Sequence, residues 1–328
     1  MTTLETWDDL SELTRGFMAS KVIIAAAELE VFDHLADDGS TAEKVAAHYG
    51  GTQRAFAIVL DALAALGVIE KHDERYRNTP LGRRHLVTTS PHYLGDGVRL
   101  RIEMWESWSK LEALLRGESV ERPELVEDPE CNRRFIRAMH AYHFDEARQI
   151  APLLELEGVT TALDLGGGAA SYAIAFCLEA PDLRVVLIDL PLTLETARHY
   201  VEDHGLADRI TLQDGDFYRD PACDLGGPYD LVFISNVLHI EDEEHNLALL
   251  RDVADATSPG GRIVINEVPI KDNLIEPLWG ALFAVNMLLV TERGNNYPQR
   301  TLAAWLQDVG CTRVDFLTEA LTIGQKDA

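Results

Sequence analysis

Three acidic residues and a run of three glycines are the part of this sequence whose types and spacing most clearly indicate chemistry. Asp164 ends an apolar run, and glycines occupy 166–168. A strand, a tight turn and a helix N-terminus in this order form the usual nucleotide-binding end of an open α/β sheet. Asp189 follows the last glycine by 21 residues, the spacing at which a carboxylate accepts hydrogen bonds from a ribose. Asp216 precedes the aromatic Phe217, and the two suit an adenine. Together these residues predict a site for an adenosine-containing ligand.

A dinucleotide is the rival ligand for this turn. Gly166 and Gly168 match the first part of G-x-G-x-x-G, but Ser171 stands in the place of the third glycine. No arginine or lysine follows the turn to meet a phosphate. An adenosyl ligand without phosphates therefore fits these residues better.

His239 is the candidate for proton transfer. It follows the apolar run 230–235, so we expect it to project over the sheet edge towards the ligand. Glu267, at the end of the next expected strand, could hold one imidazole tautomer and stabilise the imidazolium. Histidine is a suitable base at neutral pH for an acceptor such as a phenol, whose pKa is near roughly 10. The residues alone fit equally well a histidine that caps the helix expected at 241–257.

The sequence gives little support for a metal or a disulfide. His140 and His143 stand three residues apart, but no third ligand of a suitable type is near them in the sequence, so no metal is expected. The four cysteines are scattered without paired spacing, which predicts free thiols in a reducing compartment. They are Cys131, Cys177, Cys223 and Cys311.

Strand and helix patterns alternate from residue 159 onward, which predicts an α/β fold with a parallel sheet covered on both faces. The expected strands are 161–165, 184–189, 210–216, 230–235, 262–268, 312–317 and 320–325. The expected helices include 191–203 and 241–257. Only two residues separate the last two strands, so they should form an antiparallel hairpin, which a plain dinucleotide fold lacks. The sheet is thus predicted to be Rossmann-like with a C-terminal hairpin.

The first 92 residues have a winged-helix pattern. Apolar residues recur at helical spacing over 10–35, and two further helices are expected, one after the cap Ser40-Thr41 and one at 52–66. Two short strand-like runs up to Asn78 follow as a wing. The expected third helix is rich in alanine and leucine, whereas reading DNA bases requires residues such as arginine and asparagine. A dimerisation module is therefore favoured over a DNA-binding one.

The bulk composition supports this interpretation. The formal net charge is −26, from 55 acidic and 29 basic residues, and so acidic a surface repels nucleic acid and anionic membranes. The longest apolar run, 277–290, is too short to span a bilayer, and the N-terminus has no signal-peptide pattern. We expect a cytoplasmic protein.

The motifs together resemble those of the class I S-adenosylmethionine-dependent O-methyltransferases that act on small molecules. This group includes plant caffeate and flavonoid enzymes, acetylserotonin methyltransferase and bacterial antibiotic-tailoring enzymes of secondary metabolism. The resemblance covers nearly the whole chain and follows the family order: the winged domain, Asp164-Leu165-Gly166-Gly167-Gly168, Asp189-Leu190-Pro191, Gly215-Asp216-Phe217 and Val237-Leu238-His239-Ile240-Glu241-Asp242-Glu243-Glu244-His245.

The resemblance implies roles for individual residues. His239 is the expected catalytic base, and Glu267 matches the acid that orients it. The expected cofactor-binding residues are Asp164, Gly166, Gly168, Asp189, Leu190, Asp216, Phe217 and Ser235. The cofactor would be S-adenosylmethionine and its product S-adenosylhomocysteine. The expected domains are a dimerisation domain at 1–92, a helical linker at 93–155 and the methyltransferase domain at 156–328.

An acceptor pocket is expected between three helical segments: 104–108, 135–143 and 282–289. Their side chains are large and apolar with a few polar groups, which suits a planar ring system. The expected pocket residues are Met104, Trp105, Trp108, Phe135, Met139, His143, Asn286 and Met287.

Three positions depart from the plant members of the family. Ile240 replaces an aspartate, Ser235 a lysine, and Gln299 a second glutamate that supports the histidine. A neutral amide cannot offset the charge of an imidazolium, so His239 would be a weaker base or the acceptor would need little deprotonation.

The sequence predicts a homodimeric enzyme that methylates a hydroxyl of a small aromatic or polycyclic acceptor. One alternative is an N- or C-methyltransferase in which His239 only positions the acceptor. The other is a non-catalytic winged-helix regulator that binds S-adenosylmethionine.

Overall fold

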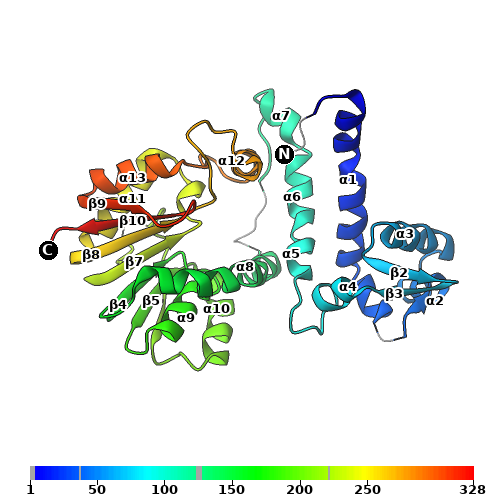
Figure 1. The fold of residues 1–328 in the computed structure, drawn as a ribbon, viewed down its shortest axis with the longest axis horizontal. Helices are drawn as coiled ribbons and strands as arrows, with labels where there is room; N and C mark the ends of the chain where they lie inside the picture. Colours follow the sequence, from blue (N-terminus) through cyan, green and yellow to red (C-terminus); the bar gives the residue numbers. More distant parts are fainter. Residues whose placement is uncertain (1–3, 37, 123–127, 221) are drawn as a thin grey trace. The chain divides into compact units, whose positions relative to one another are not determined.

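The computed structural model describes residues 4–36, 38–122, 128–220 and 222–328. The chain divides into two compact units at residue 103, residues 1–103 and 104–328, and Figure 1 traces the elements of each. The expected helical linker 93–155 is divided between them, with α5 in the first unit and α7 and α8 in the second. No helix in the described ranges is long and apolar enough to cross a membrane.

The first unit has the helices and the wing that the sequence predicts. Its elements are α1 (Trp7–Glu28), η1 (Val31–Leu35), β1 (Ser40–Thr41), α2 (Ala42–Tyr49), α3 (Gln53–Ala65), β2 (Ile69–His72), β3 (Arg75–Asn78), α4 (Pro80–His85) and α5 (Gly95–Arg99). The strands form an antiparallel sheet in the order β1-β3-β2. The hydroxyls of Thr41 and Thr52 cap α2 and α3.

The first helix is shorter than the apolar pattern suggested. It ends at Glu28, and Glu30 adopts a left-handed conformation with φ +52°, so the chain resumes as the 3-10 turn η1. This break turns Phe32 and Leu35 into the core of the unit, where both are fully buried with Leu60 and Leu63 of α3.

The second unit is built on a seven-stranded sheet in the order β6-β5-β4-β7-β8-β10-β9. Its strands are β4 (Thr161–Leu165), β5 (Arg184–Asp189), β6 (Ile210–Asp214), β7 (Tyr229–Ser235), β8 (Thr257–Asn266), β9 (Cys311–Phe316) and β10 (Leu321–Lys326). The first five are parallel, while β10 runs antiparallel to both β8 and β9. The predicted parallel sheet and terminal hairpin are confirmed.

Helices cover both faces of this sheet, as Figure 1 shows. Along β4, Ala162 packs with α8, α9 and α10, whereas Leu163 packs with α11 and α13, because successive strand residues point to opposite faces. The remaining elements are α6 (Arg101–Trp108), α7 (Leu111–Leu115), α8 (Pro129–Ile150), η2 (Ala151–Leu154), α9 (Ser171–Glu179), α10 (Pro191–Asp203), η3 (Leu238–Ile240), α11 (Glu243–Asp255), α12 (Leu278–Val290) and α13 (Gln299–Asp308).

Some expected element ends are wrong by a few residues. β6 ends at Asp214, because the backbone of Asp216 already begins a turn that its own side chain caps. β8 ends at Asn266, so Glu267 follows the strand. The expected helical run 93–155 is also interrupted, since α7 ends at Leu115 and the described residues 116–122 are not helical.

Asp164 is a buried acid in the middle of the sheet. One carboxylate oxygen accepts a hydrogen bond from the Ala173 backbone N–H at 3.2 Å, and the other has no hydrogen-bond partner in the described chain. Burial raises its pKa to about 7, because a charge inside the sheet loses its hydration. A raised native pKa means that the folded state holds a proton which the unfolded state releases near its usual pKa of 3.8.

We therefore expect the free energy of unfolding of the wild-type protein to fall as pH rises from about 4 to about 7. Measured against Asp164→Asn, the fall should be on the order of a few kcal/mol. Urea unfolding of the ligand-free protein over this range measures the difference. Asp230→Asn is the control. Burial acts to raise the pKa of Asp230, but hydrogen bonds from Thr160 and Thr161 outweigh it, so the pKa is lowered. The contribution of Asp230 to the free energy of unfolding therefore changes only in more acidic solution. Parallel curves for wild type and Asp164→Asn would exclude the buried proton.

Candidate active site

The glycine turn after β4 is packed too tightly for a side chain at two of its three glycines. A Cβ on Gly166, where φ is +71°, would lie 2.5 Å from Val237 Cγ2, and one on Gly167 would lie 2.6 Å from Leu187 Cδ1. Gly168 differs, because nothing lies within 4 Å of its Cβ position. Val237 and Leu187 therefore pack against one side of the turn, whereas the backbone at Gly168 is open. A ligand can approach such bare main chain closely.

Asp189 fastens this turn to the end of β5. Its carboxylate accepts the Gly168 N–H at 2.8 Å and the Leu190 N–H at 2.7 Å. Burial raises its pKa, while these two hydrogen bonds oppose the shift. Asp189 was expected to accept from a ribose, and the structure adds that it shapes the turn beside that position. Leu190 is the residue that precedes α10 and its Pro191.

Asp216 and Phe217 lie at the end of the neighbouring strand. The Asp216 carboxylate accepts the backbone N–H groups of Tyr218 and Arg219 at 3.3 and 3.0 Å, which fixes the turn. The ring of Phe217 reaches the glycine turn, since a Cβ on Gly166 would stand 3.4 Å from its Cζ. The structure thus brings Asp189 and Phe217 against the glycine turn, and Asp216 lies next to Phe217 in the turn that follows β6.

Ser235 ends β7 and is held by amides. Its hydroxyl accepts hydrogen bonds from Asn236 Nδ2 and Asn266 Nδ2, both at 3.1 Å. Asn266 also donates to the hydroxyl of Tyr172 at 3.0 Å. Ser235 therefore lies at the expected strand end, next to an amide network that the sequence did not predict.

His239 and Glu267 form a buried pair. His239 Nδ1 lies 2.6 Å from Glu267 Oε2, and the other oxygen of Glu267 accepts the backbone N–H groups of Val237 and Leu238 at 2.9 and 2.7 Å. An ionised carboxylate at this position makes Nδ1 the protonated nitrogen. Nε2 has no hydrogen-bond partner among the described residues, so it is the nitrogen available to take a proton.

The segment after α12 supports His239 from its backbone side. The Asn295 N–H donates to the His239 carbonyl at 3.0 Å, and a Cβ on Gly294 would stand 2.3 Å from the same oxygen. Phe283 of α12 presents its ring edge-on to the imidazole, with centroids 4.9 Å apart. Sequence reasoning did not single out these three residues, although Gly294 before two asparagines was an available signal for a tight backbone contact.

The structure joins some of the predicted pocket residues. The Trp108 indole of α6 donates to Asn286 Oδ1 of α12 at 3.0 Å, and the adjacent Met287 is buried. Phe283 places the same helix against His239. Met104 and Trp105 also lie on α6.

The predicted pocket residues of α8 form a separate group. Phe135, Met139 and His143 are partly buried along this helix. His143 Nδ1 pairs with Glu146 at 2.8 Å, and Glu146 also accepts the Tyr172 hydroxyl at 3.2 Å. The hydrogen bonds and ring contacts of the described residues do not connect these three residues directly to α12.

Gln299 does not support His239 as its sequence position suggested. Its amide nitrogen donates to the carbonyl of Thr318 at 2.8 Å and, at longer distances, to Leu321 and Thr322. Those contacts hold the loop before β10. Glu267 is the carboxylate that contacts the imidazole in the described chain.

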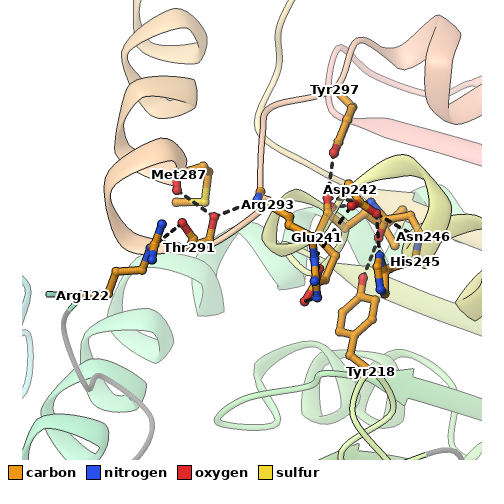
Figure 2. Close-up of polar contacts among 12 residues, drawn as sticks. Arg122, Tyr218, Glu241, Asp242, His245, Asn246, Met287, Thr291, Arg293 and Tyr297 are labelled. Atoms are coloured by element: carbon orange, nitrogen blue, oxygen red, sulfur yellow. Dashed lines mark hydrogen bonds and ion pairs between the residues drawn. The ribbon is translucent and has the colours of Figure 1, made fainter. Parts of the chain in front are cut away.

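The pair His140 and His143, weighed from the sequence as metal ligands, makes other contacts. His140 Nδ1 bonds the Ser171 hydroxyl at 2.9 Å, and burial lowers its pKa to about 4. Within the described residues, the group with metal-ligand spacing is instead Glu241, Asp242 and His245. Asp242 caps α11, and Arg293 pairs with Glu241 at 2.7 Å, so protein groups already occupy these carboxylates. Figure 2 shows this cluster.

Two family models match the chain. An O-methyltransferase domain covers residues 122–310, and an O-methyltransferase dimerisation domain covers residues 11–88. The dimerisation domain supports a homodimer.

Relatives of known function span nearly the same length. The chain is 32% identical to 3-hydroxy-5-methyl-1-naphthoate 3-O-methyltransferase of Streptomyces sahachiroi, over 93% of this chain and 89% of that protein. It is 30% identical to the tetracenomycin polyketide synthesis 8-O-methyl transferase TcmO of Streptomyces glaucescens, over 97% and 96%. Human N-acetylserotonin methyltransferase, solved with S-adenosylmethionine, shares the fold with a TM-score of 0.86 and 24% identity over the full length of both chains.

These matches span both domains of an enzyme family, so they support a methyltransferase rather than the non-catalytic regulator. The chain belongs to the S-adenosylmethionine-dependent O-methyltransferase family.

Proposed function

We propose that this enzyme transfers the methyl group of S-adenosylmethionine to a hydroxyl of a small aromatic or polycyclic acceptor, with His239 as general base. The observation that carries the proposal is the buried pair of His239 and Glu267, in which Nδ1 is engaged at 2.6 Å and Nε2 is left open. One of the two relatives described above is named as an O-methyltransferase of a naphthoate, and the other as an O-methyl transferase of polyketide synthesis. Both names agree with this acceptor class.

The residues around the glycine turn fit the cofactor. The space over the Gly168 backbone is open, and the Phe217 ring lies beside the turn. Acidic side chains at the strand ends can accept hydrogen bonds from the hydroxyl and amino groups of the cofactor. We assign Asp189 to the ribose, Asp216 and Phe217 to the adenine, and Asp164 and Gly166 to the support of the turn. Leu190 and Ser235 border this position at the ends of β5 and β7.

Glu267 prepares His239 for proton transfer. One of its oxygens fixes the Nδ1–H tautomer, so that Nε2 carries the lone pair. The other oxygen holds two N–H groups of the same segment, which fixes the backbone from which the imidazole extends. As His239 takes the acceptor's proton, the carboxylate offsets the charge of the imidazolium. When bound, S-adenosylmethionine supplies an activated methyl, so the remaining task is to hold acceptor and donor in line.

The acceptor is proposed to lie beside α12 and α6. Phe283 and Met287 offer apolar surface, and the bonded pair of Trp108 and Asn286 offers a fixed amide. Met104 and Trp105 extend this wall along α6, and Phe135, Met139 and His143 are proposed for the opposite wall. The linker 93–155 would thus contribute most of the pocket.

An N- or C-methyltransferase remains the second candidate. It is favoured by the contacts of His239, because Gln299 turns to the loop before β10 and Glu267 is the carboxylate that contacts the imidazole in the described chain. In that case His239 positions the acceptor, and its removal has a smaller effect on turnover.

Replacing the base tests the proposal. We expect His239→Ala to lower kcat with a phenol panel by about 10²- to 10⁴-fold, because deprotonation of the acceptor is lost. Glu267→Gln should lower kcat as well, because its amide cannot stabilise an imidazolium. Formation of S-adenosylhomocysteine measures turnover.

His245→Ala is the matched control for the base. This histidine lies in the same segment, partly exposed and paired with Asp242 at 2.6 Å, and it should leave kcat within about threefold, because a surface ion pair contributes little. Retention of most activity in His239→Ala would exclude general-base O-methylation.

The N-terminal domain is proposed to form the dimer through α1. Trp7, Leu10 and Leu13 lie on this helix with exposed fractions of 77%, 41% and 64%. Exposed apolar residues at helical spacing mark an interaction surface. We expect Leu13→Glu to convert the dimer to a monomer, since it buries a charge in the interface.

Light scattering coupled to size exclusion measures the mass of each variant. Leu178→Glu is the control, because Leu178 is similarly exposed on α9. A dimer that persists in Leu13→Glu at micromolar concentration would show that α1 does not form the interface.

A further inference from the structure

A tyrosine and an asparagine connect the proposed adenosine site to the base. Tyr218 follows Phe217 directly, and its backbone N–H is held by the Asp216 carboxylate at 3.3 Å. Its hydroxyl donates to Asn246 Oδ1 at 2.6 Å. Figure 2 shows the two side chains meeting across the space between the β6 turn and α11. The pair therefore links two segments that are 28 residues apart.

Asn246 holds the backbone on both sides of His239. Its amide nitrogen donates to the carbonyl of Leu238 at 2.7 Å and to that of Glu241 at 3.1 Å. Asn246 has no exposed surface. Burial also raises the pKa of Tyr218, so the phenol keeps its proton and remains a donor.

We propose that Tyr218 and Asn246 are positioning residues that couple cofactor binding at the Asp216–Phe217 turn to the placement of His239. The coupling rests on the proposed function of His239 as the base. A ligand that orders the turn fixes Tyr218, Tyr218 fixes the Asn246 amide, and that amide fixes the carbonyls on either side of the imidazole.

The opposite side of the His239 segment has its own fixed contacts. Arg293 pairs with Glu241 at 2.7 Å, and the Tyr297 hydroxyl donates to the Glu241 carbonyl at 2.7 Å. Together with Asn295 on the His239 carbonyl, these contacts come from the segment after α12. Asn246 lies on α11 and is instead linked, through the Tyr218 hydroxyl, to the Asp216–Phe217 turn. A change at that turn can therefore reach the backbone around His239 through this amide.

A merely structural role and a coupling role make different predictions. Tyr218→Phe removes one hydroxyl and leaves a buried amide oxygen without its donor, which typically costs about tenfold in an equilibrium constant. If the pair couples the two sites, this loss should appear in cofactor binding and in turnover. If the pair is only structural, it should appear in unfolding alone.

Tyr229→Phe is the matched control. The Tyr229 hydroxyl is also buried and donates at 2.9 Å to the carbonyl of Leu225. Tyr229 begins β7, whereas Ser235 ends that strand and His239 follows it. The control loses a comparable hydrogen bond away from the proposed site.

The experiment is a double-mutant cycle on the full-length enzyme with Tyr218→Phe and Asn246→Leu. Calorimetric titration gives the Kd for S-adenosylhomocysteine, and kinetics give kcat and KM. We expect Tyr218→Phe to raise this Kd and lower kcat by about three- to tenfold each in the wild-type background. In the Asn246→Leu background the same change should have less than a twofold effect, because the link is already broken. Tyr229→Phe should lower Tm and leave the Kd unchanged.

Amide hydrogen exchange supplies a measurement that does not depend on turnover. Saturating S-adenosylhomocysteine should slow exchange over residues 237–241 in wild type and Tyr229→Phe, and Tyr218→Phe should lose at least half of that protection. The coupling is wrong if S-adenosylhomocysteine protects residues 237–241 equally in Tyr218→Phe and in wild type. It is also wrong if Tyr218→Phe changes the Kd and kcat by the same factors in the wild-type and Asn246→Leu backgrounds. Hydrogen exchange and binding need no catalysis. An active His239→Ala variant would therefore exclude His239 as the base, but it would not decide whether Tyr218 and Asn246 couple the two sites. If Asn246→Leu does not fold, comparison of Tyr218→Phe with Tyr229→Phe still decides it.

Discussion

The buried carboxylate of Glu267 is the interaction on which the site depends. A carboxylate with an exposed fraction of 4% is stable only when its oxygens are hydrogen-bonded. Two backbone N–H groups satisfy one oxygen, and His239 satisfies the other. These three hydrogen bonds stabilise the buried carboxylate of Glu267. They also fix the segment 237–239 and select the imidazole tautomer. The contacts that stabilise this segment are therefore the same ones that would prepare His239 for its proposed role as the base.

The parallel sheet makes this arrangement possible. The carboxyl ends of β4, β5, β6 and β7 lie at one edge, so residues from distant parts of the sequence meet there without long connections. The ends of β5, β6 and β7 each carry a side chain that fixes nearby groups. Asp189 fastens the glycine turn, Asp216 caps the turn that holds Phe217, and Ser235 lies in the amide network. These side chains are held by the ends of rigid strands, as the proposed in-line transfer requires.

The hydrogen-bonded pair of Tyr218 and Asn246 adds a connection across this edge. A buried hydrogen-bond network holds its members rigidly when each polar group in it is satisfied. Here the phenol has one acceptor and the amide two. The proposed adenosine site and the proposed base are thus connected by the same pair of side chains.

The sequence by itself determined the fold class and most of the chemistry. The alternation of periods predicted the sheet, the triple glycine predicted the turn, and the spacing of Asp189 and Asp216 predicted acids at one edge, because these signals are local. The pairing of His239 with Glu267 was also predictable, since both follow neighbouring strands.

Only the tertiary structure decided which polar groups satisfy one another. Gln299 stands where a supporting acid was expected, yet its amide turns to the loop before β10. Phe283, Asn246 and Tyr218 gave no sequence signal, because ring contacts and side chain to backbone hydrogen bonds depend on distances between segments that are far apart in the chain. A residue type and its spacing determine what chemistry is available. Packing determines which partner each group finds, because a buried polar group must be satisfied by whatever the fold brings within reach.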